Sequence, residues 1–294
     1  MQWKKATLIG VGLLGGSLGL AIKRHDLAGQ VVGYVRRKAS LDECARLGVV
    51  DYATLELGEA VNGADLIVFC TPVSQMGVLA NQMIPYLSAG AIVTDVGSVK
   101  MAVIKALEKP IMKTGAFFVG SHPMAGGEKM GMAAARADLF EKAICIITPT
   151  KKTKPEAAGR VRQLWEATGM KVISMSPSEH DVLVSRSSHL PHVVAAALVN
   201  MVLADGHKTQ QAQLCATGFR DTTRIASGSP EMWRDISLAN RRALSEALRM
   251  FTRELSVFRK ALLASDAAAL EKFFADAKMR RDNWKLGAES HSQE

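Results

Sequence analysis

The sequence predicts an α/β fold, with a mostly parallel β-sheet in residues 1–176 and an all-α part in residues 177–294. Two observations carry this prediction. Short apolar segments rich in Val and Ile alternate with helical patterns as far as Met175, and no strand pattern follows that residue. Strands that are apolar throughout are typical of parallel sheets covered on both faces by helices. A chain of 294 residues is also long enough for about two domains.

The predicted strands are short, and helical segments separate them, for example 16–25 and 74–87. This alternation is the sequence pattern of βαβ units, which build an open, mostly parallel sheet. The predicted strands are Ala6–Gly10, Val31–Val35, Leu66–Thr71, Ala91–Asp95, Phe117–Gly120, Ile144–Thr148 and Lys171–Met175.

The all-α part begins at the helix-start signal around Pro177. A helix is predicted over 181–205, with a kink at Pro191 because proline removes a backbone donor. A second helix is predicted over 237–264, and Asp266 is expected to cap a final helix over 267–285.

The helix predicted over 237–264 carries an apolar stripe with alternating spacings of four and three residues, typical of helices that pair along one seam. The stripe leaves two interpretations open: packing within one subunit, or a homodimer formed through the C-terminal helices. Its members are Leu244, Leu248, Phe251, Leu255, Phe258 and Leu262.

Composition and charge exclude several classes of protein. The net charge is +9, but no block of about five basic residues occurs, so no nucleic-acid partner is expected. The basic balance suits small anionic ligands or a solvated surface. No apolar run reaches about 18 residues and no signal peptide is recognised, so we expect a cytoplasmic protein without membrane contact. The four cysteines lie far apart with no CxxC pair, so neither a zinc site nor a redox motif is expected.

A glycine-rich turn connects the first predicted strand to the first helix, with the spacing GxGxxG. This is the sequence context of a Rossmann-type dinucleotide site. Gly10 permits the tight turn, Gly12 lets the pyrophosphate approach the backbone, and Gly15 lets the helix pack closely. Leu13 and Leu14 lie within this turn, ahead of the predicted helix, whose N-terminus faces the phosphates. The alternative is a glycine-rich turn with no ligand.

The end of the second predicted strand bears on the choice between NAD and NADP. An acid that binds the ribose 2′-hydroxyl of NAD is expected near Val35, but Arg36, Arg37 and, further on, Ser40 follow instead. A 2′-phosphate would meet guanidinium groups there, which favours NADP over NAD. In the alternative interpretation, both arginines are solvated and the site accepts either cofactor.

Three further segments follow the ends of predicted strands, where open parallel sheets bind ligands. Thr71, Pro72 and Val73 are expected on the cofactor side of this edge. His122 is predicted as a general base, because a neutral imidazole can accept a proton near neutral pH. Ser98 is predicted to hydrogen-bond either His122 or the substrate.

Several polar side chains of the all-α part share one helix face, at spacings of three and four residues. We interpret them as the polar lining of a site, since no further ligand completes a metal set. These side chains are Ser185, Ser188, His189 and His192.

Two arginines of the all-α part, Arg220 and Arg224, are four residues apart. One is expected to pair with Asp221 or Asp235, leaving the other for a substrate carboxylate. In the alternative interpretation, both arginines form surface ion pairs of little energetic value.

Taken in order, the motifs resemble those of the prephenate/arogenate dehydrogenase family of tyrosine biosynthesis. That family has an N-terminal Rossmann domain and a helical C-terminal dimerisation domain. Each stretch is weak evidence alone, but their order within 6–236 is specific. The matching stretches are Gly10–Gly16, Asp95–Lys100, Gly120–Gly126, Ser188–His192, Phe219–Arg224 and Met232–Ile236.

The resemblance implies an oxidative decarboxylation with hydride transfer to NAD or NADP, giving 4-hydroxyphenylpyruvate from prephenate or tyrosine from arogenate. It implies that His122 takes the proton of the 4-hydroxyl, and that Ser98 bonds this hydroxyl and orients the histidine. It also implies that Arg224 holds a substrate carboxylate. The helical side of the site would comprise Ser188, His189, His192 and the nearby Trp233.

One departure from the family pattern concerns the substrate side chain. Gly127 stands where a larger polar residue is expected, and Glu128 follows it. A carboxylate there would favour the ammonium group of arogenate over the keto group of prephenate. Alternatively, Glu128 pairs with Lys129 or Arg136.

Two other functions remain as alternatives. Another two-domain NADP-dependent dehydrogenase would share the glycine turn but would not need His122 and Arg224 together. A non-catalytic dinucleotide-sensing protein would be expected to have lost one of these two residues.

Overall fold

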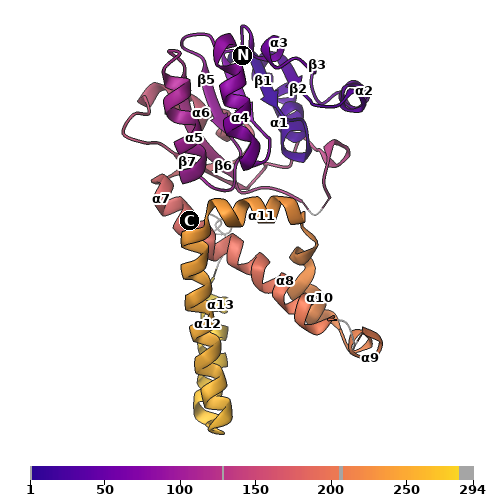
Figure 1. The fold of residues 1–294 in the computed structure, drawn as a ribbon, viewed down its shortest axis with the longest axis vertical. Helices are drawn as coiled ribbons and strands as arrows, with labels where there is room; N and C mark the ends of the chain where they lie inside the picture. Colours follow the sequence, from indigo (N-terminus) through magenta and orange to yellow (C-terminus); the bar gives the residue numbers. More distant parts are fainter. Residues whose placement is uncertain (1, 128, 205–207, 285–294) are drawn as a thin grey trace, which may run out of the picture. The chain divides into compact units, whose positions relative to one another are not determined.

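The computed structural model describes residues 2–127, 129–204 and 208–284. The chain divides into two compact units, Met1–Arg241 and Arg242–Glu294 (Figure 1). The first unit contains the sheet and the helices up to α11 (Pro230–Ala239). The second contains most of α12 (Arg241–Leu263), together with α13 (Ala267–Asn283).

The first unit is built on one eight-stranded sheet with the order β3-β2-β1-β4-β5-β6-β7-β8. All neighbouring strands run parallel except β6 and β7. The chain continues from β1 to β2 on one side and returns to β4 on the other, so the strand order reverses at β1. Ligands bind at such a switch point, beyond the carboxyl ends of the strands. The strands are β1 (Trp3–Ile9), β2 (Ala28–Tyr34), β3 (Tyr52–Thr54), β4 (Leu66–Phe69), β5 (Ile92–Asp95), β6 (Phe117–Pro123), β7 (Ile144–Thr148) and β8 (Lys171–Ser174).

The prediction of a mostly parallel sheet is confirmed, and every predicted strand overlaps an observed one. The sequence did not reveal β3, because three residues at the sheet edge are too few to show an alternating pattern. Strand β6 is longer than predicted: it pairs antiparallel with β7 and places His122 opposite Ile146. His122 therefore lies within a strand, not in the loop after it.

Helices cover both faces of the sheet, which explains why its strands are apolar throughout. Neighbouring residues of β1 belong to different cores, since Leu8 packs in one and Ile9 in the other. Side chains from α1, α2 and α6 complete the first core, and those from α3, α4 and α5 complete the second. These helices are α1 (Leu13–Arg24), α2 (Lys38–Leu47), α3 (Leu57–Val61), α4 (Val73–Met83), α5 (Met101–Met112) and α6 (Pro155–Ala167).

After β8 the described chain is helical. It begins with α7 (Pro177–Val184), a π-helical turn (Ser185–His189) and α8 (Leu190–Val202), which run on without a break. Ser176 caps the start, as the sequence indicated, by accepting a hydrogen bond from the backbone of Glu179.

The kink predicted at Pro191 is replaced by the π-helical turn just before it. There the backbone N–H of Leu190 donates to the carbonyl of Ser185, five residues back. Proline has no N–H and crowds the carbonyl four residues before it, so a wider turn accommodates it without ending the helix.

The continuous helix 177–202 is longer than the apolar run expected from sequence. With a mean hydropathy of 1.3 over its best window, it is long and apolar enough to cross a membrane by length and composition alone. Packed helices of other proteins pass this test too. Only 22% of that window is buried, and Met201 is among its exposed apolar side chains.

Of the helices that follow α8, α11 is tied to α4 by a hydrogen bond between Asp235 and Ser74. The single helix predicted over 237–264 is wrong, because α11 ends at Ala239 and α12 begins at Arg241. Between them Asn240 uses its side chain to donate to the carbonyl of Asp181, which holds the chain at this point. The elements are α9 (Lys208–Gln213), α10 (Thr217–Thr223), a 3₁₀ turn (Arg224–Ser227), α11 (Pro230–Ala239) and α12 (Arg241–Leu263).

The second unit pairs α12 with α13 (Ala267–Asn283). Asp266 caps α13 through the backbone N–H of Ala269, as predicted. Phe258 packs against Phe273 and Phe274 between the two helices. Apolar side chains on this hairpin remain exposed, among them Leu255 at 52%. The predicted end of the last helix, at residue 285, lies outside the described residues.

Candidate active site

The glycine turn has the geometry that close approach of a dinucleotide requires. Gly10 has a φ of +96°, a conformation that L side chains rarely adopt. A Cβ on Gly15 would lie 2.0 Å from the carbonyl oxygen of Gly10, so α1 can start this close to β1 only with glycine there. A Cβ on Gly12 would meet nothing within 4 Å, which leaves its backbone open to a ligand.

The start of α1 leaves backbone donors available for a phosphate. No side chain caps this helix, and its first turn, which includes Leu13 and Leu14, contains no acid. Uncapped N–H groups and the helix dipole favour an anion at this position. Thr71 lies beside the turn, and its buried hydroxyl has no hydrogen-bond partner within the described residues. These features fit a dinucleotide, held between the turn and the segment formed by Thr71, Pro72 and Val73.

The end of β2 presents basic side chains next to the glycine turn, since β2 pairs with β1. Arg36 and Arg37 are exposed, and within the described part of the chain neither has an acidic partner. Arg37 precedes the first residue of α2, and the N–H of half-buried Ser40 donates to its carbonyl. Basic groups therefore stand where an acid would bind the ribose 2′-hydroxyl.

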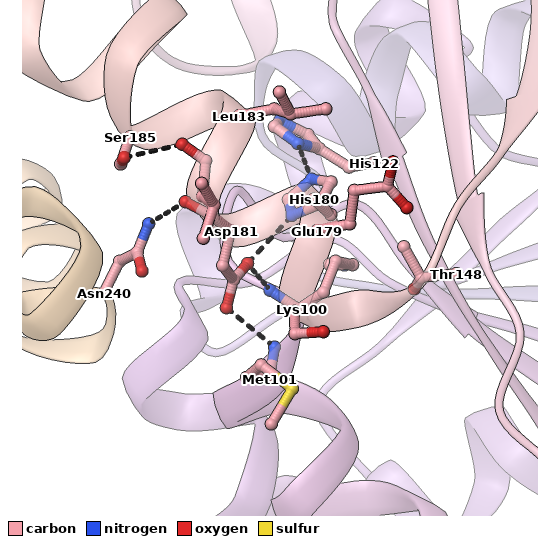
Figure 2. A network of polar contacts seen from close by, with 12 residues as sticks. Lys100, Met101, His122, Thr148, Glu179, His180, Asp181, Leu183, Ser185 and Asn240 are labelled. Atoms are coloured by element: carbon pink, nitrogen blue, oxygen red, sulfur yellow. Dashed lines mark hydrogen bonds and ion pairs between the residues drawn. The ribbon is translucent and has the colours of Figure 1, made fainter. Parts of the chain in front are cut away.

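His122 is buried at the carboxyl-end edge of β6 and belongs to a line of hydrogen bonds (Figure 2). Its Nδ1 lies 2.8 Å from Nε2 of His180, the last residue of the first turn of α7. The Nδ1 of His180 lies 2.8 Å from Oδ1 of Asp181. Sequence reasoning assigned the orienting bond of His122 to Ser98. In the structure His180 makes this bond.

Asp181 connects α7 to the sheet part of the chain. Its carboxylate accepts the backbone N–H of Lys100 at 2.7 Å and that of Met101 at 3.0 Å, at the start of α5. Its own carbonyl accepts a hydrogen bond from the side chain of Asn240. The line through His122 is therefore anchored at its far end by two segments, one on each side of Asp181 (Figure 2).

Burial keeps the histidines of this site neutral near neutral pH. It lowers the pKa of His122 well below the ordinary value, and positive charge on His180, Lys100 or His189 lowers it further. Burial also lowers the pKa of His180, and the Asp181 carboxylate opposes that shift. A neutral histidine has a lone pair that can accept a proton.

A buried polar network lies beneath His122. The Lys100 ammonium pairs with the Asp95 carboxylate and donates to the carbonyl of Ser121 at 2.6 Å. The hydroxyl of Ser121 bonds the carbonyl of Asp95 and the side chains of Thr94 and Trp165. Since every polar group in it has a partner, this network can hold the backbone on both sides of the site rigidly.

His189, His192 and Trp233 form the helical side of the site. His189 lies 3.2 Å from Asn240 through Nδ1, while its buried Nε2 has no hydrogen bond of good geometry among the described residues. Burial lowers its pKa to about 4, and the Asp181 carboxylate and, more weakly, the backbone of Ser98 oppose that shift. The ring of His192 stacks on Trp233 at 3.8 Å between centroids.

Arg224 begins the 3₁₀ turn after α10 and is exposed. It lies near enough to His192 to lower the pKa of that ring, although burial lowers it more. The neighbouring Ile225 fixes His192 by accepting a hydrogen bond at its carbonyl, 3.0 Å from Nδ1. The predicted basic residue is thus brought to the helical side of the site.

The other predicted residues lie as follows. Ser98 is half-buried after β5, and its hydroxyl makes no hydrogen bond within the described residues. Ser188 is half-buried in the π-helical turn, whereas the hydroxyl of Ser185 is turned back onto the carbonyl of Val182. Asp235 pairs with Arg234 and accepts a hydrogen bond from Ser74, which ties α11 to α4. Glu128 lies outside the described residues.

Sequence reasoning missed His180, Asp181, Lys100 and Asn240. A signal existed for the first two, because an adjacent histidine and aspartate follow a helix start at Ser176. Nothing in the sequence linked them to His122, 58 residues earlier. No group of three or more His, Cys, Asp or Glu side chains in the described ranges is placed to hold a metal ion.

Comparison with known proteins covers both parts of the chain. Residues 18–174 match the nucleotide-binding domain of prephenate dehydrogenase, and residues 176–276 match its dimerization domain. The chain is 36% identical over 288 residues to a prephenate dehydrogenase of Bacillus subtilis, covering 95% of this chain and 76% of the relative. It is 35% identical to a cyclohexadienyl dehydrogenase of Zymomonas mobilis, with 95% of each chain covered.

Solved structures agree in fold over nearly the whole length. A prephenate dehydrogenase of Aquifex aeolicus, in complex with hydroxyphenyl propionate and NAD+, superposes with a TM-score of 0.89 at 32% identity, covering 96% of this chain and 98% of that one. The arogenate dehydrogenase of Synechocystis gives 0.79 at 31% identity, covering 95% and 99%. The glycine turn, the buried histidine and these matches together make this chain an NAD(P)-dependent oxidoreductase that belongs to the prephenate/arogenate dehydrogenase family.

Proposed function

We propose that the chain oxidises and decarboxylates prephenate or arogenate, with His122 as the catalytic base. The observation that carries this assignment is that His122 is buried and neutral, and lies at the same edge of the sheet as the glycine turn. One of its ring nitrogens is held by His180 at 2.8 Å. A base in this state can accept a proton near neutral pH, as the reaction requires.

The proposed reaction needs one proton acceptor and no net proton release. The glycine turn of Gly10, Gly12 and Gly15 would hold an oxidised nicotinamide dinucleotide, which would supply the acceptor for the hydride on the ring carbon that bears the 4-hydroxyl. His122 takes the proton of that hydroxyl, which leaves a ketone. Loss of the ring carboxylate as CO2 returns an electron pair through the ring to this oxygen, and His122 gives the proton back to form the phenol.

The driving force comes from aromatisation, so the remaining side chains need mainly to hold the substrate. We assign a substrate carboxylate to Arg224, beside His192 on the helical side. Ser98 has a hydroxyl free of protein partners in the described structure, and we assign it to the substrate 4-hydroxyl. Ser188, His189 and Trp233 complete that side.

We propose NADP as the preferred cofactor. Exposed Arg36 and Arg37 stand next to the glycine turn, and Val35 occupies the position where an acid would favour NAD. Guanidinium groups bind phosphate in a planar, two-point fashion, so a 2′-phosphate gains more from them than a hydroxyl does. Ser40 can add a hydroxyl donor at the first turn of α2.

We propose arogenate as the better substrate, an assignment that rests on the sequence around Glu128. Its carboxylate would attract the ammonium group that distinguishes arogenate from prephenate. Replacement of Glu128 by Gln should then reduce kcat/KM for arogenate and leave that for prephenate unchanged. An equal loss for both substrates would contradict this role.

We propose a cytoplasmic homodimer that pairs through its C-terminal helices. The family description of residues 176–276 as a dimerization domain supports this arrangement. So do the exposed apolar side chains of the α12–α13 hairpin, including Leu255 and Phe274. All four cysteines are free thiols, which suits a reducing compartment. We also propose the functional domain boundary at 176/177, close to where one family match ends at residue 174 and the next begins at residue 176.

The test is a two-by-two turnover assay of prephenate or arogenate with NADP or NAD, followed by the absorbance of reduced nicotinamide. We expect turnover with a maximum for arogenate and NADP. His122→Ala should lower kcat by about 10²–10⁴-fold with cofactor binding intact. Folded protein that binds NADP but turns over neither substrate would refute the proposed reaction, and an active His122→Ala would refute the base.

A further inference from the structure

The hydrogen bonds around His122 determine which of its ring nitrogens carries the proton. The Asp181 carboxylate accepts two backbone N–H groups and also faces Nδ1 of His180 at 2.8 Å. An ionised carboxylate can only accept hydrogen bonds, so Nδ1 of His180 must be the protonated nitrogen. A neutral imidazole has a single N–H, and Nε2 of His180 is therefore an acceptor.

The same argument applies to the ring of His122. Nδ1 of His122 lies 2.8 Å from the accepting Nε2 of His180, so Nδ1 of His122 must donate. Its Nε2 is then left with the lone pair. Because the backbone at the start of α5 holds the Asp181 carboxylate as an acceptor, the direction of both hydrogen bonds is fixed.

We propose that His180 and Asp181 are positioning residues that hold His122 as its Nδ1–H tautomer, so that Nε2 is the nitrogen that takes the substrate proton. This inference rests on the proposed role of His122 as the base. When Nε2 gains a proton, the Nδ1–H bond to His180 becomes a hydrogen bond from a cation and strengthens. The Asp181 carboxylate then faces a positive charge through one intervening ring.

The other charged groups around the pair make this support necessary. The pKa of His122 is lowered by burial, by His180 when that ring is protonated, by Lys100 at the start of α5 and by His189 of the π-helical turn. A neutral His180 that accepts the Nδ1–H of His122 carries no such charge. For His180, Lys100 also lowers the pKa, while Asp181 and Asp95 raise it. In these surroundings, the negative charge of Asp181, acting through His180, stabilises the protonated form of His122.

The experiment compares two replacements of His180 with a control histidine. His180→Gln keeps an oxygen that can accept the Nδ1–H of His122, whereas His180→Leu fills similar space without an acceptor. His25→Gln removes an exposed histidine just after α1, far from the site. For each variant, kcat and KM are measured against pH, with thermal unfolding and NADP binding as checks.

We expect His180→Leu to lower the plateau of kcat by at least about tenfold, the size expected for loss of a charge-assisted hydrogen bond. Its acid limb should move to lower pH, because the protonated base is less stabilised. His180→Gln should recover most of the plateau, and His25→Gln should match the wild type. KM should change little in any of them.

A merely structural role for His180 gives a different pattern. Both replacements would then lose activity in step with thermal stability, and the pH profile of the remaining activity would be unchanged. That result, or full activity in His180→Leu, would overturn the proposal. Absence of turnover in the wild-type protein would instead refute the proposed function.

A second measurement does not depend on the folding of any His180 variant. In ¹⁵N NMR of the wild-type protein labelled at histidine, His122 should show a protonated Nδ1 and an unprotonated Nε2. Its signals are identified by their loss in His122→Gln. A proton on Nε2 of His122 at neutral pH would overturn the assignment.

Discussion

Replacement of Lys100 by Met should destabilise the first unit and also change the pH dependence of catalysis. The Lys100 ammonium and the Asp95 carboxylate it pairs with are both fully buried. Removal of one partner of a buried ion pair costs about 3–5 kcal/mol, because the other charge remains unpaired. Asp95 keeps the backbone N–H groups of Gly97 at 2.8 Å and Ser121 at 3.2 Å, which argues for the lower end, about 3 kcal/mol.

That free energy converts into a measurable shift in melting temperature. For the first unit, Met1–Arg241, a loss of about 3 kcal/mol corresponds to a fall of roughly 6–12 °C. The backbone N–H at position 100 still reaches Asp181, so α7 keeps its anchor in the variant. Addition of Asp95→Asn removes the second charge, and the double variant should recover most of the loss.

The matched control is Lys152→Met. Lys152 lies 3.8 Å from Glu108, and its side chain is 60% exposed. Glu108 keeps a hydrogen bond from Thr150 when this lysine is removed. Because the Lys152 ammonium is solvated and lies at the long limit of ion-pair distance, its removal should cost less than about 1 kcal/mol, although Glu108 itself is largely buried. If the Lys100→Met protein had the same melting temperature as the Lys152→Met control, the reasoning about the buried charge would be refuted.

The pH profile supplies an independent readout. The positive charge of Lys100 is one cause of the lowered pKa of His122, after burial and His180, so its removal should raise that pKa. The base acts when neutral, and the rate falls as pH drops through its pKa. The acid limb of kcat should therefore move to higher pH in Lys100→Met. An unchanged limb, or one moved to lower pH, would contradict the assigned electrostatics.

Three further predictions follow from the cofactor turn, the β2 end and the helical hairpin. Gly15→Ala should lower the melting temperature and abolish NADP binding, since its Cβ would lie 2.0 Å from a backbone oxygen. Gly12→Ala meets no atom within 4 Å and should fold normally but bind NADP at least about tenfold more weakly. Arg36→Ala and Arg37→Ala should each raise KM for NADP about tenfold and leave KM for NAD within about twofold. Leu255→Glu should convert a dimer into a monomer in light scattering, because its exposed side chain would carry a charge into the paired helices.

Each of these predictions has an outcome that contradicts it. Wild-type stability in Gly15→Ala would mean that α1 can move away from the turn. Equal increases in KM for NAD and NADP in the two arginine variants would show that neither side chain binds the 2′-phosphate. A Leu255→Glu protein that remains dimeric would place the interface on another surface.

The site was predictable from sequence where its chemistry is local. The glycine turn could be recognised because φ values and close backbone approach are properties of consecutive residues, as Gly10 and Gly15 show. His122 could be selected because it stands near the end of a buried strand. Its hydrogen-bond partner could not be predicted, since Ser98 and His180 were equally open to it in the sequence and only packing decides between them.

The helical part shows the same division. The periodicity of apolar residues correctly predicted helical structure on both sides of residue 240, but it predicted one continuous helix through that residue. Asn240 ends α11 because its side chain reaches Asp181, 59 residues earlier. Pro191 was read as a kink, and the backbone instead took one wider turn, which periodicity cannot distinguish.

The sequence by itself determined the order of the strands except β3, the helical character of the chain after Met175, the dinucleotide turn and the identity of the proposed base. These depend on patterns of neighbouring residues, whose physical consequences are the same wherever the segment lies. The tertiary structure alone decided that Asp181, His180 and His122 form one line of hydrogen bonds and that Lys100 lies buried beside it. Hydrogen bonds act over about 3 Å, and only the folded chain brings residues so far apart in sequence to that distance.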